Sequence, residues 1–139
     1  MDIYRRYGPA LVRKATRLLG NRDDALDVVQ SLFTDLFERG VIHGTAGVPG
    51  TDAELPYLYR ALTNRCLTML RDRTTRARLL QRETPALRPV VRTRCDDHAL
   101  GQDLLLKLVD RLDDQTLEVL VYRYWDDLDQ TEIASVMGV

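Results

Sequence analysis

The chain lacks the long apolar runs and the paired cysteines that mark several large protein classes. No apolar stretch in its 139 residues approaches the roughly 20 residues that a transmembrane helix needs, and its first ten residues contain no apolar signal core. Its two cysteines lie in different segments and give no disulfide framework, which fits a reducing compartment. We therefore expect a globular protein of the cytoplasm with no membrane contact.

The sequence is also poor in the motifs that carry catalysis. It has no glycine-rich phosphate loop, and its only two histidines fall in a predicted loop and a predicted linker. Paired acids such as Asp113 and Asp114 stand at predicted helix starts, where carboxylates cap the helix and complement its dipole. We predict that the protein is not an enzyme and that it uses no metal ion and no cofactor.

Apolar residues recur at steps of three and four along most of the chain, which is the period of an amphipathic helix. No segment shows a convincing strand pattern, so the expected fold class is all-α. The pattern predicts helices over 2–19, 23–39, a long segment from 55 onward, 100–112, 113–125 and 129–137. A glycine-rich loop over 40–54 and a linker over 84–97 separate these helices, which predicts two small helical domains, 1–83 and 98–139.

The last predicted helix has clear signals at both ends. Asp129 and Glu132 have the spacing of a capping box, in which side chains and backbone donors at a helix start satisfy one another. Gly138 follows the last apolar position, where a left-handed residue ends a helix and lets the chain reverse. These signals predict the first helix of a helix-turn-helix, with the second helix missing from the sequence.

The net charge of −1 conceals a strong segregation of charge along the chain. Basic and acidic residues number 7 and 8 over 1–59, 10 and 2 over 60–94, and 3 and 11 over 95–139. All ten basic residues of the middle block are arginines, which suit phosphate contact because the guanidinium grips oxygens bidentately and releases counterions. A solvated helix face, or an arginine face paired with the acidic C-terminal third, fits the charge pattern equally well. Because the linker is short, we expect the acidic third to fold back near the arginines.

Three stretches, taken together and in this order, point to a family. They are "DALDVVQSLFTDLF", "YLYRALTNRCLTMLRDR" and, after the linker, "LDDQTLEVLVYRYWDDLDQTEIASVMGV". They resemble the bacterial RNA polymerase sigma factors of the extracytoplasmic-function group, in the order second sigma region, linker, fourth sigma region. The resemblance covers nearly the whole chain, and it implies a second-region domain over 1–83 and a partial fourth-region domain over 98–139 that lacks the recognition helix.

The resemblance also implies a function and its residues. A sigma factor of this group binds the clamp helices of core RNA polymerase and directs promoter recognition and melting for transcription initiation; an anti-sigma factor is a further expected partner. The residues that match the clamp-binding pattern are Asp24, Asp27, Gln30 and Phe33. The promoter DNA-binding residues expected from the second stretch and its arginines are Tyr57, Arg60, Asn64, Arg65, Arg71, Arg73 and Arg76. Tyr57 replaces the family's tryptophan and keeps an aromatic face on which an unpaired base can stack.

Two other functions remain as alternatives. A sigma-like chain of this length could bind polymerase or an anti-sigma partner without initiating transcription. An ordinary helix-turn-helix repressor would bind DNA without polymerase, but the clamp-like stretch over 24–37 argues against it.

Overall fold

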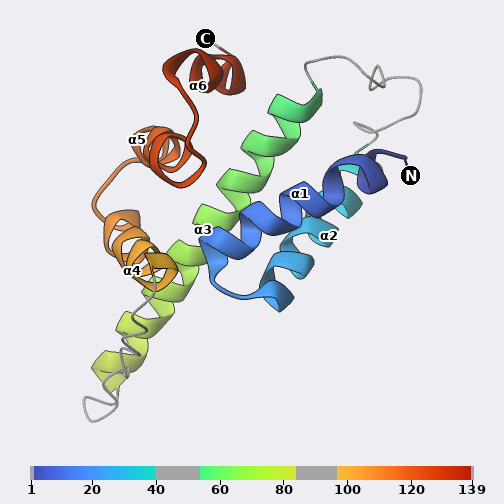
Figure 1. Cartoon of the computed structure of the whole chain (residues 1–139). Helices are drawn as coiled ribbons and strands as arrows, with labels where there is room; N and C mark the ends of the chain where they lie inside the picture. The colour runs from blue at the N-terminus through green and yellow to red at the C-terminus, as the bar shows by residue number, and fades with distance from the viewer. Residues whose placement is uncertain (1, 40–53, 84–96, 139) are drawn as a thin grey trace.

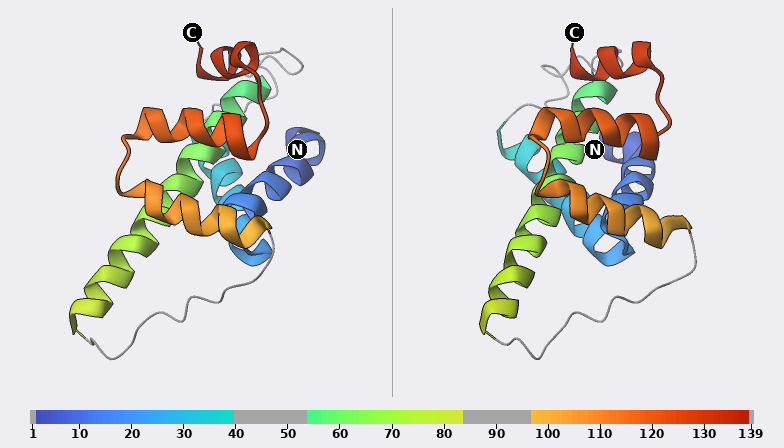
Figure 2. Two further views of the ribbon diagram at one scale, coloured as in Figure 1. Left: turned by 60° about the vertical axis from the view of Figure 1, so that its left-hand side comes forward. Right: turned by 90° about the vertical axis from the view of Figure 1, so that its left-hand side faces the viewer.

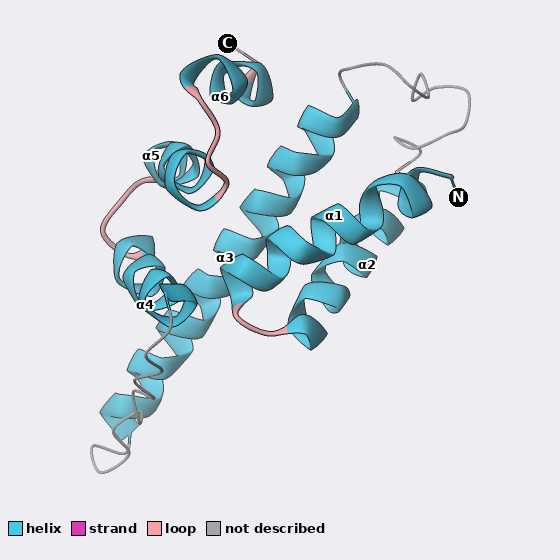
Figure 3. Ribbon diagram, in the orientation of Figure 1, coloured by secondary structure: helices cyan, strands magenta, loops and turns pink. Residues whose placement is uncertain are grey.

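The structure is a computed structural model that describes residues 2–39, 54–83 and 97–138. These residues form helices joined by short turns and contain no strand, which confirms the all-α fold class (Figures 1 and 3). The predicted loop and linker lie outside the described residues, except for the last residue of each. The helices are α1 (Asp2–Leu19), α2 (Arg22–Glu38), α3 (Glu54–Glu83), α4 (Asp97–Val109), α5 (Asp114–Leu120), η1 (Val121–Trp125) and α6 (Gln130–Met137).

The first three helices share an apolar core. A tight turn joins α1 to α2, with Gly20 at a φ of 84° that glycine adopts without the steric penalty of a Cβ. Asn21 then caps α2 by accepting a hydrogen bond from the backbone N–H of Asp24. The apolar stripes predicted from the sequence face inward, with buried residues that include Leu11, Ala15 and Leu18 of α1, Ala25, Val29 and Leu32 of α2, and Leu58, Leu62, Cys66 and Leu70 of α3.

α3 is 30 residues long, and only part of it lies in this core. Leu70 is the last fully buried residue of the helix, and all of residues 75–82 are exposed. In Figure 1 the end of α3 projects beyond the bundle. The helix therefore carries a long surface that the other described helices leave open.

The C-terminal helices stack along α3 (Figure 2). Leu105 and Val109 of α4, with Leu117 and Val121 of α5 and η1, are fully buried and belong to the same core cluster as α1, α2 and α3. The expected return of the acidic third to the arginine helix is therefore confirmed. The division of the chain into two domains at the linker stays a prediction.

The predicted helix over 113–125 is two segments. α5 ends at Leu120 and continues as a wider π turn, in which the backbone N–H of Asp126 donates to the carbonyl of Val121 at 3.1 Å. The signals at the ends of the last helix are confirmed: both bonds of the capping box between Asp129 and Glu132 are present, and Gly138 has a φ of 73°.

Candidate nucleic-acid interface

The outer face of α3 presents a line of exposed side chains, which we call the α3 strip. Its members are Tyr57, Asn64, Thr68 and Thr75, and their steps of seven, four and seven residues keep them on one side of the helix. Tyr57 is 51% exposed, which leaves its ring open to solvent. The structure thus brings Tyr57 and Asn64, both predicted from the sequence to contact DNA, into one exposed line.

A first row of arginines flanks the α3 strip on the side of the C-terminal helices. The row pairs with carboxylates in antiparallel order, as Arg60–Glu118, Arg71–Asp114 and Arg78–Asp110. Arg60 also donates to the backbone carbonyl of Met137 at 3.2 Å, and Arg71 donates to the carbonyl of Val109 at the same distance. These three arginines therefore tie α3 to the ends of α4 and α6 and to α5.

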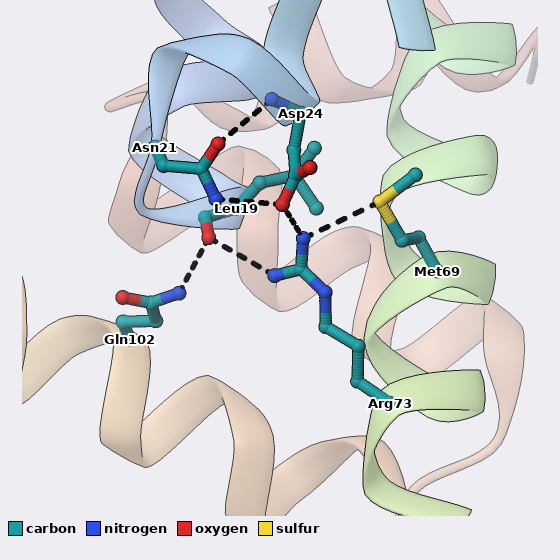
Figure 4. A network of polar contacts seen from close by, with 6 residues as sticks. All are labelled: Leu19, Asn21, Asp24, Met69, Arg73 and Gln102. Atoms are coloured by element: carbon teal, nitrogen blue, oxygen red, sulfur yellow. Dashed lines mark hydrogen bonds and ion pairs between the residues drawn. The ribbon is translucent and has the colours of Figure 1, made fainter. Parts of the chain in front are cut away.

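Two further arginines of α3 pair with carboxylates of α2: Arg65 lies beside the strip, whereas Arg73 lies on the core side of the helix. Arg65 contacts Asp35, and its hydrogen bond is the main reason why the pKa of that carboxyl is lowered. Arg73 contacts Asp24 and donates to the carbonyl of Leu19 at 3.2 Å (Figure 4). Figure 4 also shows Gln102 of α4 donating to that same carbonyl, at 2.7 Å. The network therefore joins α3, the α1–α2 turn and α4.

Most of the arginines predicted to bind DNA are thus held by carboxylates of this chain. Arg60, Arg65, Arg71 and Arg73 each form an ion pair, whereas Arg76 is exposed and has no carboxylate partner among the described residues. The pairing between arginines and the acidic third, one of the interpretations open from charge alone, is present in the structure.

A recess of about 400 Å³ lies between α3 and α5. Predicted DNA-binding residues line its α3 side, namely Arg60, Asn64 and Arg71, together with Leu67 and Thr68. α5 forms the opposite wall with Asp114, Gln115 and Glu118. A ligand that enters the recess would meet guanidinium, amide and hydroxyl donors on one side and two carboxylates on the other.

A buried charge cluster anchors Asp126, the residue that follows η1, to α1. The ammonium of Lys14, a residue only 1% exposed, contacts the Asp126 carboxylate and lies 3.8 Å from the centre of the Tyr59 ring. Arg17 reaches the other oxygen of that carboxylate at 3.1 Å. Burial lowers the pKa of Lys14 from 10.5 to about 8, because the loss of water outweighs the attraction of Asp126.

Glu118 is the second buried acid at this junction. It is 3% exposed and accepts hydrogen bonds from Arg60, at 2.8 Å, and from the Tyr122 hydroxyl, at 2.7 Å. Burial raises the pKa of the Tyr122 hydroxyl, and its bond to the Glu118 carboxylate raises it further. Both donors bind the same carboxylate oxygen, Oε1, and both belong to the fold, so Glu118 serves as a structural partner of Arg60.

The residues predicted to bind polymerase separate into two groups on α2. Asp27 and Gln30 are exposed. Phe33 is 7% exposed and packs edge-on against the Tyr4 ring at a centroid distance of 5.1 Å, so it belongs to the core. Asp24 is half-buried and bound to Arg73.

Asp27 and Gln30 belong to a longer exposed line, which we call the α2 stripe. Its members Asp23, Asp27, Gln30, Thr34 and Phe37 follow one another at steps of four, three, four and three, on the side opposite the core. The sequence reasoning missed Phe37, whose ring is 49% exposed. The helical spacing from Asp27 was the available signal for it.

Comparison of the chain with protein-family models, with curated proteins and with solved structures found no match. Within the described ranges, no group of three or more histidine, cysteine, aspartate or glutamate residues could hold a metal ion. None of the described helices is both long enough and apolar enough to span a membrane.

Proposed function

We propose that this chain is a transcription factor of the sigma type, as its sequence resemblance implies, which binds core RNA polymerase through α2 and promoter DNA through α3. The observation that carries the proposal is the arrangement of α3, where an exposed aromatic ring and polar side chains lie between the first arginine row on one side and Arg65 and Arg76 on the other. Proteins that hold single-stranded nucleic acid combine such elements, because arginines neutralise the backbone while an aromatic face stacks a base.

The α2 stripe supports the polymerase half of the proposal. It combines carboxylates and an amide with a half-exposed phenylalanine, and exposed aromatic side chains surrounded by polar ones are common at protein interfaces. The stripe points away from the core, so a partner could cover it without rearrangement of the bundle. Phe33 then acts by shaping α2 from the inside, and Asp24 by its bond to Arg73.

The DNA half is tested at Tyr57. Tyr57→Ala should weaken binding of the full chain to a fluorescein-labelled single-stranded oligodeoxynucleotide by about fivefold to a hundredfold, since stacking on one base contributes roughly 1–3 kcal/mol. Tyr57→Phe keeps the ring and should bind like the original chain. Affinity should also fall steeply with salt, because phosphate contact releases counterions. Binding that neither salt nor Tyr57→Ala changes would contradict a nucleic-acid surface on α3.

The polymerase half is tested on the α2 stripe. Asp27→Ala combined with Gln30→Ala should reduce competition with the labelled chain for bacterial core RNA polymerase while helicity stays unchanged. A matched control is Asp72→Ala with Gln81→Ala, which removes the same residue types from exposed positions on α3. Equal competition by the two double variants would reject the assignment.

One observation favours a second function, a sigma-like chain that binds polymerase without initiating. Four of the arginines expected on DNA are already paired within the chain. Transcription in vitro with core polymerase separates the two: an initiating factor yields promoter-directed RNA, and a sequestering one lowers the yield obtained with another sigma factor.

A further inference from the structure

Two of the acids that pair with the first arginine row, Asp110 and Asp114, lie outside the core, unlike the buried Glu118. In each pair one side chain is mostly exposed: Asp114 at 78% against Arg71 at 31%, and Arg78 at 59% against Asp110 at 27%. Ion pairs in such positions form and break at little cost, because water and salt screen them on both sides. Carboxylates at these positions can therefore be exchanged for another anion.

The segment that carries them is anchored independently of these pairs. Leu117, Val121 and Tyr122 are fully buried, and Asp126 is bound to Lys14 of α1. Loss of the pairs at Asp110 and Asp114 leaves all of these contacts in place. α5 therefore remains packed on α3 whether or not Asp110 and Asp114 are paired with arginines.

Carboxylate and phosphate compete for the same feature of arginine. Both bind the planar guanidinium through two oxygens, so an arginine that holds a carboxylate cannot make the same contact with a DNA backbone. Asp114 also stands across the recess from Asn64 and Arg71, where its charge repels an approaching phosphate.

We propose that the segment from Asp110 to Asp114 is a built-in competitor of nucleic acid, whose two carboxylates occupy Arg78 and Arg71 until a DNA strand displaces them. The inference rests on the proposed nucleic-acid surface of α3 and assigns its regulation to the acidic third of the same chain. A factor built this way binds DNA weakly by itself, because the strand must first displace the two carboxylates.

Neutral variants of the full chain test the competition. Asp110→Asn with Asp114→Asn removes both exposed carboxylates and keeps their shape. The charge-matched control is Glu38→Gln with Asp127→Asn, two exposed acids that contact no α3 arginine; asparagine also suits the positive φ of 58° at residue 127. Both variants raise the net charge by two, so any difference between them comes from position.

At low salt the first variant should bind a 15-nucleotide fluorescein-labelled oligodeoxythymidylate about three- to tenfold more tightly than the control, as expected for two freed surface arginines. The difference should vanish in high salt. Adding Arg71→Gln and Arg78→Gln to the first variant should cancel the gain. Circular dichroism checks that every variant stays helical.

Two results would overturn the inference while leaving the proposed function intact. If both neutral variants bind alike, the carboxylates do not compete; if the first variant binds more weakly than the original chain, they hold the arginines in place for DNA. Absence of binding by every variant at every salt concentration would remove the nucleic-acid surface itself, and this inference with it.

Discussion

The two sides of α3 are held in different ways. Toward α1 and α2 it buries an apolar line, Leu58, Leu62, Cys66 and Leu70, against apolar partners. The partly exposed ion pairs Arg65–Asp35 and Arg73–Asp24 lie beside this line. Toward α4, α5 and α6 its contacts combine a smaller apolar patch with ion pairs, and Asp126, which follows η1, pairs with the buried Lys14 of α1. Apolar burial is insensitive to salt and pH, whereas charge pairing depends on both. We call the bundle of α1, α2 and α3 the frame, because its packing should not depend on salt or pH. We call the C-terminal helices the attached layer, because salt and pH should change how tightly they bind to the frame.

Among single substitutions, one in the core of the frame should lower the free energy of unfolding the most. Leu62→Ala leaves a cavity at a fully buried position and should lower the free energy of unfolding by about 2–5 kcal/mol, at low and high salt alike. Urea titration followed by circular dichroism measures it. The control Leu79→Ala, at a position 54% exposed, should change the same quantity by about 0.5 kcal/mol or less. A strong salt dependence of the Leu62→Ala effect would show that the frame is not apolar in its energetics.

The stability that the attached layer contributes should depend on pH, because Lys14 titrates. Its pKa falls from 10.5 to about 8 on folding, so between these values the unfolded chain binds more protons than the folded one. Stability from this residue should therefore rise as pH increases from about 8 to 10.5, by about 3 kcal/mol in all.

Titration of Cys66 changes stability in the opposite direction over an overlapping pH range, so its contribution has to be separated from that of Lys14. Burial raises the pKa of its thiol from 9.0 to about 12, so the folded chain binds more protons above pH 9 and loses stability there. The charge of Lys14 also affects the Cys66 thiol, so the lysine is isolated by the stability difference between Cys66→Ala and Cys66→Ala with Lys14→Met, neither of which carries the thiol. A difference that stays flat between pH 8 and 10.5 would contradict the burial of a charged Lys14.

The turn at Gly20 links the frame to the attached layer. A substitution there should lower the free energy of unfolding by an intermediate amount. A Cβ there would lie 2.2 Å from the Gln102 side chain and would have to adopt a φ of 84°. Gly20→Ala should lower the free energy of unfolding by about 1–2 kcal/mol, because the left-handed conformation is strained and Gln102 loses its bond to Leu19.

Two companion variants separate these causes. Gly20→Ala with Gln102→Ala removes the clash but keeps the strain. Gly8→Ala, within α1 and with only ordinary contacts to Tyr4 at 3.7 Å, should raise stability by up to about 1 kcal/mol through helix propensity. A destabilising Gly8→Ala that matches Gly20→Ala would rule out the conformational explanation.

The exposed ion pairs between α3 and the C-terminal segment should contribute least to the free energy of unfolding. A double-mutant cycle of Arg78→Gln and Asp110→Asn should give a coupling energy below about 1 kcal/mol, measured by urea unfolding, and it should approach zero in high salt. A larger and salt-independent coupling would place this pair with the frame and not with the attached layer.

Local signals in the sequence were enough to predict where the α-helices lie. The periodicity of three and four residues predicted each described α-helix but not the π turn of η1, and the spacing of Asp129, Glu132 and Gly138 predicted both ends of α6. Asp27, Gln30, Tyr57 and Asn64 were expected from the family resemblance, and the helical periodicity places all four on exposed lines of α2 and α3. These features depend on residues a few positions apart, and the chain alone determines them.

Tertiary structure decided the role of each charge. Arg71 and Arg76 look alike in the sequence, yet one is paired with Asp114 and the other is open, because α5 lies on only one side of α3. Lys14 is one basic residue among several in α1, and only the return of η1 buries it against Asp126. Opposite charges predict that two segments attract, but Coulomb attraction has no preferred direction. Which carboxylate meets which arginine was decided by the apolar contacts of Leu105, Leu117 and Val121, whose shapes fit together in one register.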